Sequence, residues 1–388
     1  MTGGRRPDIC RKVHRKRPLR RGWTTGTCAA AAAKAATAAL LGDAFPDPVD
    51  IALPDGRRVS FALAETARGA GTATAGVVKD AGDDPDVTHG ALIRVTVAAG
   101  PPGSGVGFRA GPGVGTVTRP GLALPPGEPA INPVPRQMIR NAVAEAAAAH
   151  GASVDLIVEI AIPGGEGLAR RTLNARLGIV GGLSILGTTG VVVPYSCAAW
   201  IASIHRGIDV ARAAGLAHVA GATGRTSEEA VRALHALPEV ALIEMGDFAG
   251  GMLKYLRRHP LPRVTIAGGL AKITKLAQGQ LDLHSKRGEA NLAALARLAG
   301  GEGAPAAMQV RIVAANNVAE AFALAAGLPL GDAVARAAWQ TAAAVLHPAP
   351  IALEIVLFDR AGALAGRAGF APVGIPNHGA PPGRKRRR

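Results

Sequence analysis

Apolar and polar positions along the first half of the chain form patterns that predict both helices and strands. The Ala-rich run at 28–41 predicts a helix with Thr27 as its N-cap. Further segments show strand-like alternation, helical periodicity or a continuous apolar run. They lie at 49–63, 72–79 and 91–99 (strands), 133–151 (helix), 154–162 (strand) and 195–215 (helix). The pattern predicts an α+β domain over residues 22–215.

From residue 216 the pattern changes to a strand, a glycine turn and a helix, repeated three times. The repeats cover 216–237, 240–259 and 263–279. Such a succession predicts a parallel sheet covered by helices. Helical segments follow near 288–300, 315–327 and 330–346, and a strand is predicted at 351–358. We therefore expect a mixed α/β and α+β protein of two domains. The α/β domain would span 216–346, before a strand at about 347–365 that returns to the first domain.

The basic charge is concentrated at the two ends of the chain. The net charge is +16, of which residues 1–21 carry +8 and residues 384–388 carry +5. Basic termini of this kind are usually solvated arms. We therefore expect residues 1–21 to be a basic, disordered arm and residues 366–388 to be a flexible basic tail. An arm dedicated to binding RNA or a membrane is the alternative.

The composition argues against several classes of protein. Aromatic residues make up only 3% of the chain, too few for stacking platforms that bind single-stranded nucleic acid. Cys10, Cys28 and Cys197 are too widely spaced for a disulfide framework, and the ten histidines show no metal-binding spacing. No apolar run is long enough to span a membrane. We expect a soluble, cytoplasmic protein with no metal site of its own and no membrane partner.

Glycine turns after the three strands of the α/β domain indicate a ligand site. Ligands bind beyond the carboxyl ends of parallel strands, where helix N-termini offer unpaired backbone N–H groups. An acidic residue there could accept a hydrogen bond from a ribose hydroxyl or an ammonium group. The candidate residues are Gly221, Thr223, Gly224, Gly246, Asp247 and Gly268. The alternative is that these are ordinary turns in which Thr226 and Asp247 cap helices.

Two Thr-Thr-Gly loops and one basic segment offer further polar groups. The loops provide hydroxyls and backbone donors suited to a carboxylate or a phosphate. Their residues are Thr24 and Thr25 in the first loop, and Ser184, Thr188 and Thr189 in the glycine-rich second loop. The segment HSKRG contains His284, which can exchange a proton near neutral pH. Capped turns and a basic helix end are the structural alternatives.

The most acidic stretch is VVKDAGDDPDVTHG at residues 77–90. It contains Asp80, Asp83, Asp84 and Asp86 next to Lys79, and its spacing does not match a calcium-binding EF-hand loop. Carboxylates this close repel one another, so some must face backbone N–H groups, Lys79 or a ligand. Both a structural acidic loop held by Asx turns and a catalytic carboxylate cluster fit the pattern.

Six segments along the chain occur together in an order that points to one family. They are GWTTGTCAAAAAKAA, GVVKDAGDDPDVTHG, INPVPRQMI, TLNARLGIVGGLSILGTTGVVVPYS, GDFAGGMLKYL and KITKLAQGQLDLHSK. Over residues 22–365 the chain resembles the CbiD family, the cobalt-precorrin-5B C1-methyltransferases of cobalamin biosynthesis. Val193, Leu270 and Ala271 depart from the residues expected in many members.

The resemblance implies transfer of a methyl group from S-adenosylmethionine to C1 of cobalt-precorrin-5B, giving cobalt-precorrin-6A. The cofactor would bind at the strand ends of the α/β domain, and Asp84 and His284 would handle protons. The macrocycle, which brings its own cobalt, would bind to Thr24, Thr25, Lys79, Asp80, Asp83, Arg136, Arg176, Ser184, Thr188 and Thr189. We expect no stable nucleic-acid partner. A homo-oligomer and transient contact with neighbouring enzymes of the pathway are the partners considered.

Two other functions remain as alternatives. The segment VAGATGR at 219–225 suggests a nicotinamide-dependent reductase acting on a related polycarboxylate, although the full glycine fingerprint is missing. A nucleic-acid-binding protein that uses the basic arms is the other alternative. It predicts binding that weakens steeply with salt.

Overall fold

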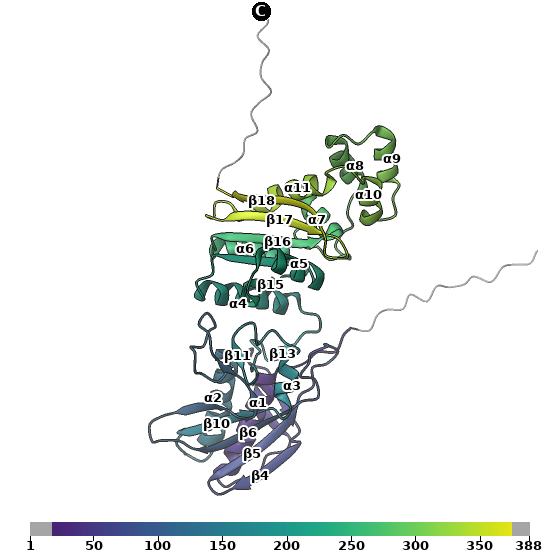
Figure 1. The fold of residues 1–388 in the computed structure, drawn as a ribbon. Coiled ribbons are helices and arrows are strands. Elements are labelled where there is room, and N and C mark those ends of the chain that lie inside the picture. The colour runs from purple at the N-terminus through teal and green to yellow at the C-terminus, as the bar shows by residue number, and fades with distance from the viewer. Residues whose placement is uncertain (1–17, 375–388) are drawn as a thin grey trace, which may run out of the picture. The chain divides into compact units, whose positions relative to one another are not determined.

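The computed structural model describes residues 18–374, and the chain folds into two compact units (Figure 1). Of the described residues, the first unit contains 18–111, 134–163 and 185–195, and the second contains 112–133, 164–184 and 196–374. The expected mixed class and two-part organisation are therefore confirmed. The expected single boundary near residue 215 is wrong, because 112–133, 164–184 and the helix that begins at Cys197 belong to the second unit.

The first unit is built on a five-stranded sheet with the order β4-β5-β6-β10-β7. Its neighbouring strands are antiparallel except for β10 and β7, which are parallel. The elements of this unit are β1 (Gly22–Trp23), α1 (Thr25–Leu40), β2 (Val49–Ala52), β3 (Arg58–Phe61), β4 (Glu65–Gly69), β5 (Thr72–Val78), β6 (Leu92–Ala99), β7 (Val106–Ala110), α2 (Pro133–Ala148), β10 (Leu156–Ala161) and β13 (Val191–Val192).

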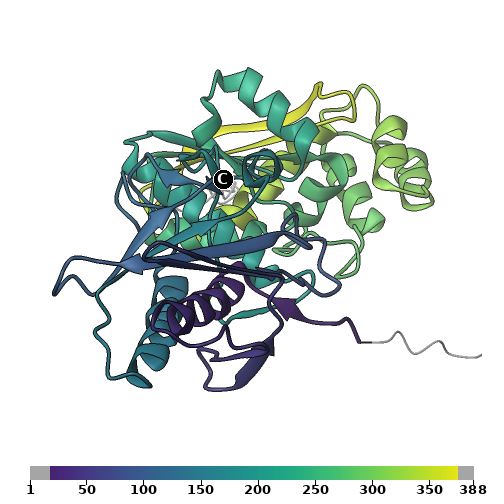
Figure 2. The same ribbon diagram turned by 90° about the horizontal axis from the view of Figure 1, so that it is seen from below.

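Helix α1 packs against β5 and β6 of this sheet, with α2 beside it (Figure 2). Thirteen of its 16 residues are buried and eight of these are alanines, whose small side chains let the helix approach the sheet closely. Thr24 caps the helix, because its Oγ1 accepts a hydrogen bond from the Thr27 backbone N at 3.2 Å. The predicted cap, Thr27, is wrong, since its hydroxyl donates to the Gly190 carbonyl at 2.7 Å.

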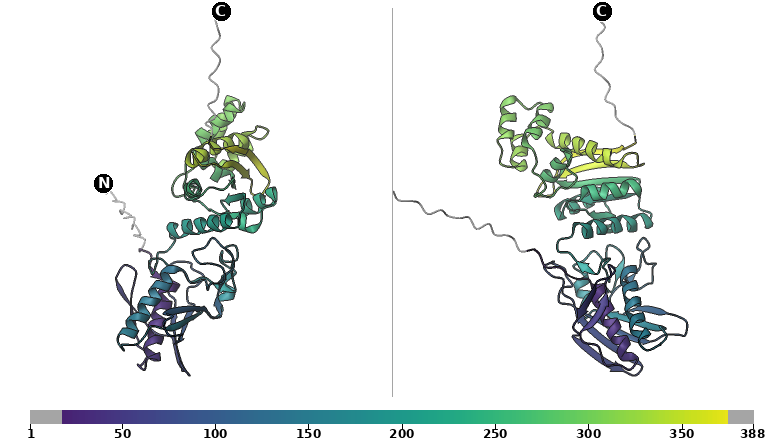
Figure 3. Two further views of the ribbon diagram at one scale, coloured as in Figure 1. Left: turned by 90° about the vertical axis from the view of Figure 1, so that its left-hand side faces the viewer. Right: turned by 180° about the vertical axis from the view of Figure 1, so that it is seen from behind.

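The second unit is built on a five-stranded sheet with the order β15-β14-β16-β17-β18, in which only β18 is antiparallel. Helix α5 packs on one face, and α4, α6, α7 and α11 form the core on the other (Figure 3). These elements are α4 (Cys197–Ala213), β14 (His218–Ala222), α5 (Arg225–His235), β15 (Leu242–Glu244), α6 (Ala249–Arg258), β16 (Arg263–Gly269), α7 (Leu270–Ala277), α11 (Leu330–Leu346), β17 (Ala352–Phe358) and β18 (Leu364–Pro372).

Shorter elements complete the second unit. They are β8 (Gly113–Val114), β9 (Thr116–Val117), α3 (Gly165–Ala169), β11 (Ile179–Val180), β12 (Gly182–Leu183), a 3₁₀ turn at Glu239–Ala241, α8 (Leu292–Gly301), α9 (Ala306–Val313) and α10 (Val318–Leu324). The pairs β8–β12 and β9–β11 tie the two early segments of this unit to each other.

Two predictions about the C-terminal region are wrong. The strand at 351–358 pairs with β16 inside the second sheet and does not return to the first domain. Residues 364–372, expected to belong largely to a flexible tail, form β18 against β17. An apolar run predicts burial but not the strand that will be its neighbour. The rest of the predicted tail, 375–388, and residues 1–17 of the predicted arm lie outside the described residues.

A buried polar network joins β16, β17 and β18 of the second sheet to α5. Glu354 is fully buried and accepts hydrogen bonds from His235 Nε2 at 2.6 Å, Thr265 Oγ1 at 2.7 Å and Arg367 Nε at 2.7 Å. His218 Nε2 lies 2.8 Å from the Thr265 hydroxyl. Burial, together with the nearby His235, lowers the pKa of His218 to about 4. The network thus satisfies a buried carboxylate with three donors.

Candidate active site

The order of strands in the second sheet creates a switch point between β14 and β16. From β14 the chain passes through α5 to β15 on one side, and then through α6 to β16 on the other side. In open parallel sheets, ligands bind at the carboxyl ends of the two strands where the winding direction reverses. The predicted residues Thr223 and Gly268 lie at these two strand ends. Thr223 N donates to the Ala267 carbonyl at 3.1 Å, which places the two loops side by side.

Two helix N-termini open at this switch point. Gly224 is the N-cap of α5 and Gly269 is the N-cap of α7, and neither helix has a side-chain cap. A Cβ added at either glycine would meet no atom within 4 Å. The first backbone N–H groups of both helices are therefore open to a ligand, and such groups favour an anion such as a carboxylate. The structural alternative, in which Thr226 caps α5, is wrong because Thr226 lies inside the helix.

Asp247 lies at the same edge of the sheet, just after β15. One of its carboxylate oxygens, Oδ1, forms an ion pair with Lys272 in α7, and the side chain is 21% exposed. Asp247 does not cap α6, whose N-cap is Phe248. The Asp247 carbonyl accepts a hydrogen bond from Leu283 N at 2.8 Å. This contact places the predicted His284 one residue away from the site, where its ring is exposed and Nδ1 accepts from Lys286 N at 3.1 Å.

The other two glycines predicted to bind the cofactor have different surroundings. A Cβ at Gly221 would collide with the Met252 sulfur, so this glycine serves packing between the sheet and α6. Gly246 has a φ of 54° and lies against the ring of Trp200. The structure thus brings Thr223, Gly224, Asp247 and Gly268 together at one edge of the sheet. Gly269, which was not predicted, also lies there, whereas Gly221 is packed under α6.

In the first unit, the two Thr-Thr-Gly loops lie against each other. β1 pairs with β13, and Thr24 N donates to the Gly190 carbonyl at 3.0 Å. Thr24 and Thr25 are buried in this contact, whereas Thr188 and Thr189 are exposed. The Thr189 hydroxyl donates to the Val191 carbonyl at 3.1 Å. The repeated tripeptide therefore marks two segments that fold together, and only the second loop presents its hydroxyls to solvent.

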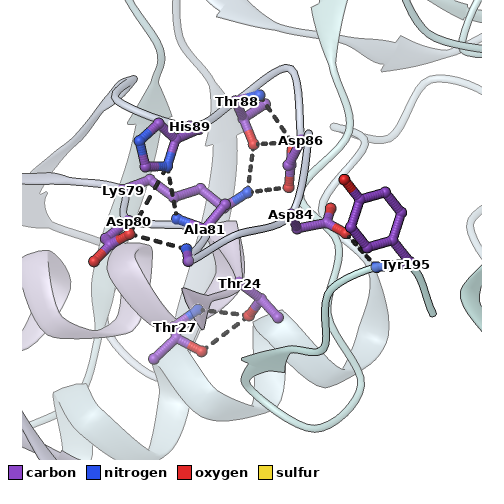
Figure 4. Close-up of polar contacts among 11 residues, drawn as sticks. Thr24, Thr27, Lys79, Asp80, Ala81, Asp84, Asp86, Thr88, His89 and Tyr195 are labelled. Atoms are coloured by element: carbon purple, nitrogen blue, oxygen red, sulfur yellow. Dashed lines mark hydrogen bonds and ion pairs between the residues drawn. The ribbon is translucent and has the colours of Figure 1, made fainter. Parts of the chain in front are cut away.

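The acidic stretch packs beside these loops, and all four of its carboxylates have protein partners; Figure 4 draws those of Asp84 and Asp86. Asp80 binds the Arg20 guanidinium (2.9 Å to Nη2), Asp83 accepts from Arg20 N at 2.6 Å and Asp84 accepts from Tyr195 N at 2.8 Å. Asp86 forms an ion pair with Lys79 and accepts from Thr88 N at 2.8 Å. The stretch thus binds the segment that contains Arg20 and the loop that ends at Tyr195, and it also pairs internally through Lys79. Within residues 18–374, no three metal-ligating side chains are grouped to hold a metal ion.

Lys79, predicted to bind substrate, is buried and bound to other groups of the first unit. Its side chain is only 2% exposed, and its ammonium group donates to Asp86 and to the Thr88 hydroxyl. A buried ammonium needs such partners, because burial without them is very costly. Burial raises the pKa of the neighbouring Cys28 thiol to about 12, despite the opposing charge of Lys79. This cysteine is therefore an unreactive core residue.

The remaining predicted substrate residues fall into both units. Arg176 in the second unit is bound to Glu228 at 2.5 and 2.9 Å and to Glu239 at 3.2 Å, and Glu228 raises its pKa. It is therefore already neutralised. Ser184 donates to Asn174 Oδ1 at 3.2 Å in the same unit. In the first unit, the Arg136 guanidinium lies over the Phe108 ring, 5.2 Å from its centroid.

Arg20 belongs to the segment expected to be a disordered arm, yet its contacts with Asp80 hold it in place. The attraction of opposite charges explains the difference, since Arg20 lowers the pKa of Asp80 to about 2. Asp80 therefore stabilises the fold above its unfolded-state pKa of about 4, and this contribution is lost as the pH falls from about 4 to 2. We expect Arg20→Ala to raise the pKa of Asp80 toward 4. Carboxyl chemical shifts followed through an NMR pH titration would show it, and an unchanged pKa would contradict this assignment.

Sequence reasoning missed two residues near the candidate sites. His89 closes the acidic stretch, and its Nδ1 accepts a hydrogen bond from Ala81 N at 3.1 Å and lies 3.8 Å from Asp80. Its position at the end of the acidic stretch is the feature of the sequence that could have identified it. Trp200 lies in α4 against Gly246. Nothing in the local sequence connects Trp200 with the strand end that it contacts.

Comparisons with known proteins place the chain in a family. The family model CbiD matches residues 12–194, and the model of the CbiD C-terminal domain matches residues 282–369. The cobalt-precorrin-5B C(1)-methyltransferase of Halorhodospira halophila is 66% identical over 91% of this chain and 95% of its own length. The enzyme of the same name from Bradyrhizobium is 65% identical over 90% of this chain and 94% of its own length.

A crystal structure of the cobalamin biosynthesis protein CbiD from Archaeoglobus fulgidus is 29% identical and covers 69% of this chain and 83% of its own, with a TM-score of 0.38. In the described part of this chain, no helix has the length and apolar character needed to cross a membrane. The family models and the sequence identity of the methyltransferases lead to one conclusion. The chain belongs to the CbiD family.

Proposed function

We propose that this chain transfers a methyl group from S-adenosylmethionine to C1 of cobalt-precorrin-5B in cobalamin biosynthesis. The observation that carries the proposal is the 66% identity, over 91% of the chain, to a cobalt-precorrin-5B C(1)-methyltransferase. The fold supports it with a switch point whose loops suit a small charged ligand. The substrate is then a cobalt-containing tetrapyrrole.

The residues at the switch point fit the methyl donor. The open N-termini of α5 and α7 suit its carboxylate, and Gly224 and Gly269 leave room for it. The second oxygen of Asp247 suits an ammonium group or a ribose hydroxyl, because only Oδ1 is held by Lys272. When bound, the donor supplies an electrophilic methyl group carried on a sulfonium. The chain contributes by orienting the two reactants, which can supply roughly 7–11 kcal/mol of the barrier.

The first unit supplies the groups that we assign to the macrocycle. The exposed Thr188 hydroxyl can donate to its carboxylates, the Thr189 hydroxyl can do so by giving up its bond to the Val191 carbonyl, and we retain Arg136 for the same task. Thr24 and Thr25 act by shaping the loop. Lys79, Asp80 and Asp83 bind other groups of the first unit, Arg176 binds glutamates of the second, and each stabilises the unit in which it lies. Asp84 remains our candidate for proton transfer, since only its Oδ1 has a described partner.

We expect Asp84→Asn to lower kcat by about 10²–10⁴-fold, the usual contribution of a positioned acid or base. Asparagine keeps an oxygen that can accept from Tyr195 N, so the loop should stay folded. Asp55→Asn is the matched control, because Asp55 lies in an exposed turn of the same unit and pairs only with Arg57. Turnover is measured with labelled methyl donor, and thermal unfolding is followed in parallel. If activity and stability fall together, Asp84 is structural.

Calorimetry with S-adenosylhomocysteine tests the donor assignment without turnover. We expect the purified chain to bind this product of the methyl donor and not to bind NADPH. Binding of NADPH alone would favour the reductase alternative. Binding to DNA that weakens steeply with salt would favour the nucleic-acid alternative.

A further inference from the structure

Trp200 presents a large aromatic surface to solvent in the second unit. It is 43% exposed, in a chain whose aromatic content is only 3%. The first turns of α4 around it, from Cys197 to Ile201, carry no charged side chain. Single exposed apolar residues are common on protein surfaces, so it is the way this ring is held that sets it apart.

The indole ring is held in one position. Its Nε1 donates to the Glu244 carbonyl at 3.2 Å, at the last residue of β15. A Cβ added at Gly246 would lie 3.4 Å from the same nitrogen, so the ring packs directly on the glycine backbone. With a φ of 54°, position 246 also favours glycine over other residues. The ring is thereby fixed against the strand end while much of its surface stays open.

This position lies on the same edge of the sheet as the switch point. The N–H groups of Met245 and Gly246 both donate to the Ala222 carbonyl, at 3.1 and 3.2 Å. Ala222 is the last residue of β14, directly before Thr223 and Gly224. Neighbouring strands are about 5 Å apart. A ligand that starts at the open helix N-termini therefore reaches Trp200 by crossing the end of a single strand.

We infer that Trp200 is the stacking surface for the adenine ring of the methyl donor, an inference that rests on the proposed function. The flat indole suits a flat heteroaromatic ring, and its uncharged surroundings suit the neutral adenine. The macrocycle is a poorer fit, because its carboxylates need cations, and Glu244 at this strand end is an acid. The donor then lies with its carboxylate at α5 and α7 and its adenine over Trp200.

Isothermal titration calorimetry of the full chain with S-adenosylhomocysteine tests this inference. We expect Trp200→Ala to weaken binding by about tenfold or more, and Trp200→Phe by less than about threefold, because phenylalanine still stacks. Trp339→Phe is the matched control. Trp339 lies in α11 with its Nε1 bonded to the Leu353 carbonyl at 2.8 Å, and its replacement should leave affinity unchanged.

Tryptophan fluorescence provides a second readout. S-adenosylhomocysteine should change the emission of the unsubstituted chain and of Trp339→Phe, and have little effect on Trp200→Phe, which still binds. Trp200→Ala that stays folded and binds as tightly as the unsubstituted chain would overturn the inference alone. So would a loss of affinity for the macrocycle with unchanged affinity for S-adenosylhomocysteine. If the unsubstituted chain does not bind S-adenosylhomocysteine at all, the proposed donor site falls together with the inference.

Discussion

Gly269→Leu is expected to weaken binding of S-adenosylhomocysteine by at least about 100-fold while the protein stays folded. The backbone at Gly269 has a φ of −72°, which any residue can adopt, and a Cβ there meets no atom within 4 Å. Leucine would therefore fit the fold, but its side chain would fill the space in front of the α7 N-terminus. We expect Gly224→Leu at the start of α5 to act in the same way. Calorimetry gives the affinities and circular dichroism the unfolding temperatures.

Gly369→Leu is the matched control for both substitutions. Gly369 lies in β18, and a Cβ there also meets no atom within 4 Å. The pairing of β18 with β17 places it away from the carboxyl end of the parallel strands. The control should bind S-adenosylhomocysteine normally. Normal binding by Gly269→Leu and Gly224→Leu would show that the donor does not use the two helix N-termini.

Glu354→Ala is expected to lower the free energy of unfolding by about 3–5 kcal/mol, the usual cost of removing one partner from a buried charged network. The carboxylate is fully buried and accepts from His235, Thr265 and Arg367, so its loss leaves three donors without their acceptor. Because His235 ends the helix that begins at the switch point, the substitution should also loosen α5. Urea unfolding at pH 7 measures the change.

Glu229→Ala provides the comparison for this measurement. Glu229 is an exposed residue of α5 that pairs with Arg225 one turn away, and such surface pairs contribute little. We expect its unfolding midpoint to stay close to that of the unsubstituted chain. If the two substitutions lower the free energy of unfolding by the same amount, the buried network is not a major source of stability in the second unit.

The sequence patterns predict the elements of the second sheet well, because strand, glycine turn and helix are encoded locally. The position of Thr223, Gly224 and Gly268 at the ends of these strands follows from the same local order. The partner of β17 could not be predicted, since its continuous apolar run fits any buried position in a sheet. The interleaving of the two units likewise depends on contacts between distant segments.

The hydrogen-bond partners of the polar residues could not be predicted from the sequence either. The local sequence makes Thr27 look like a helix cap, but its hydroxyl donates a hydrogen bond to the carbonyl of Gly190, 163 residues further along the chain. The repulsion among the four aspartates correctly predicts that they face donors, but Arg20 and Tyr195 could not be named without the fold. Trp200 is a similar case, since only folding places it against Gly246.

Turnover of cobalt-precorrin-5B by the purified chain tests the central claim most directly. The substrate is incubated with S-adenosylmethionine carrying a labelled methyl group, and the corrinoid is analysed by mass spectrometry and NMR. The account predicts that the corrinoid gains one labelled methyl group at C1. A folded chain that binds both reactants and leaves the corrinoid unmethylated, or methylates another carbon, would contradict it.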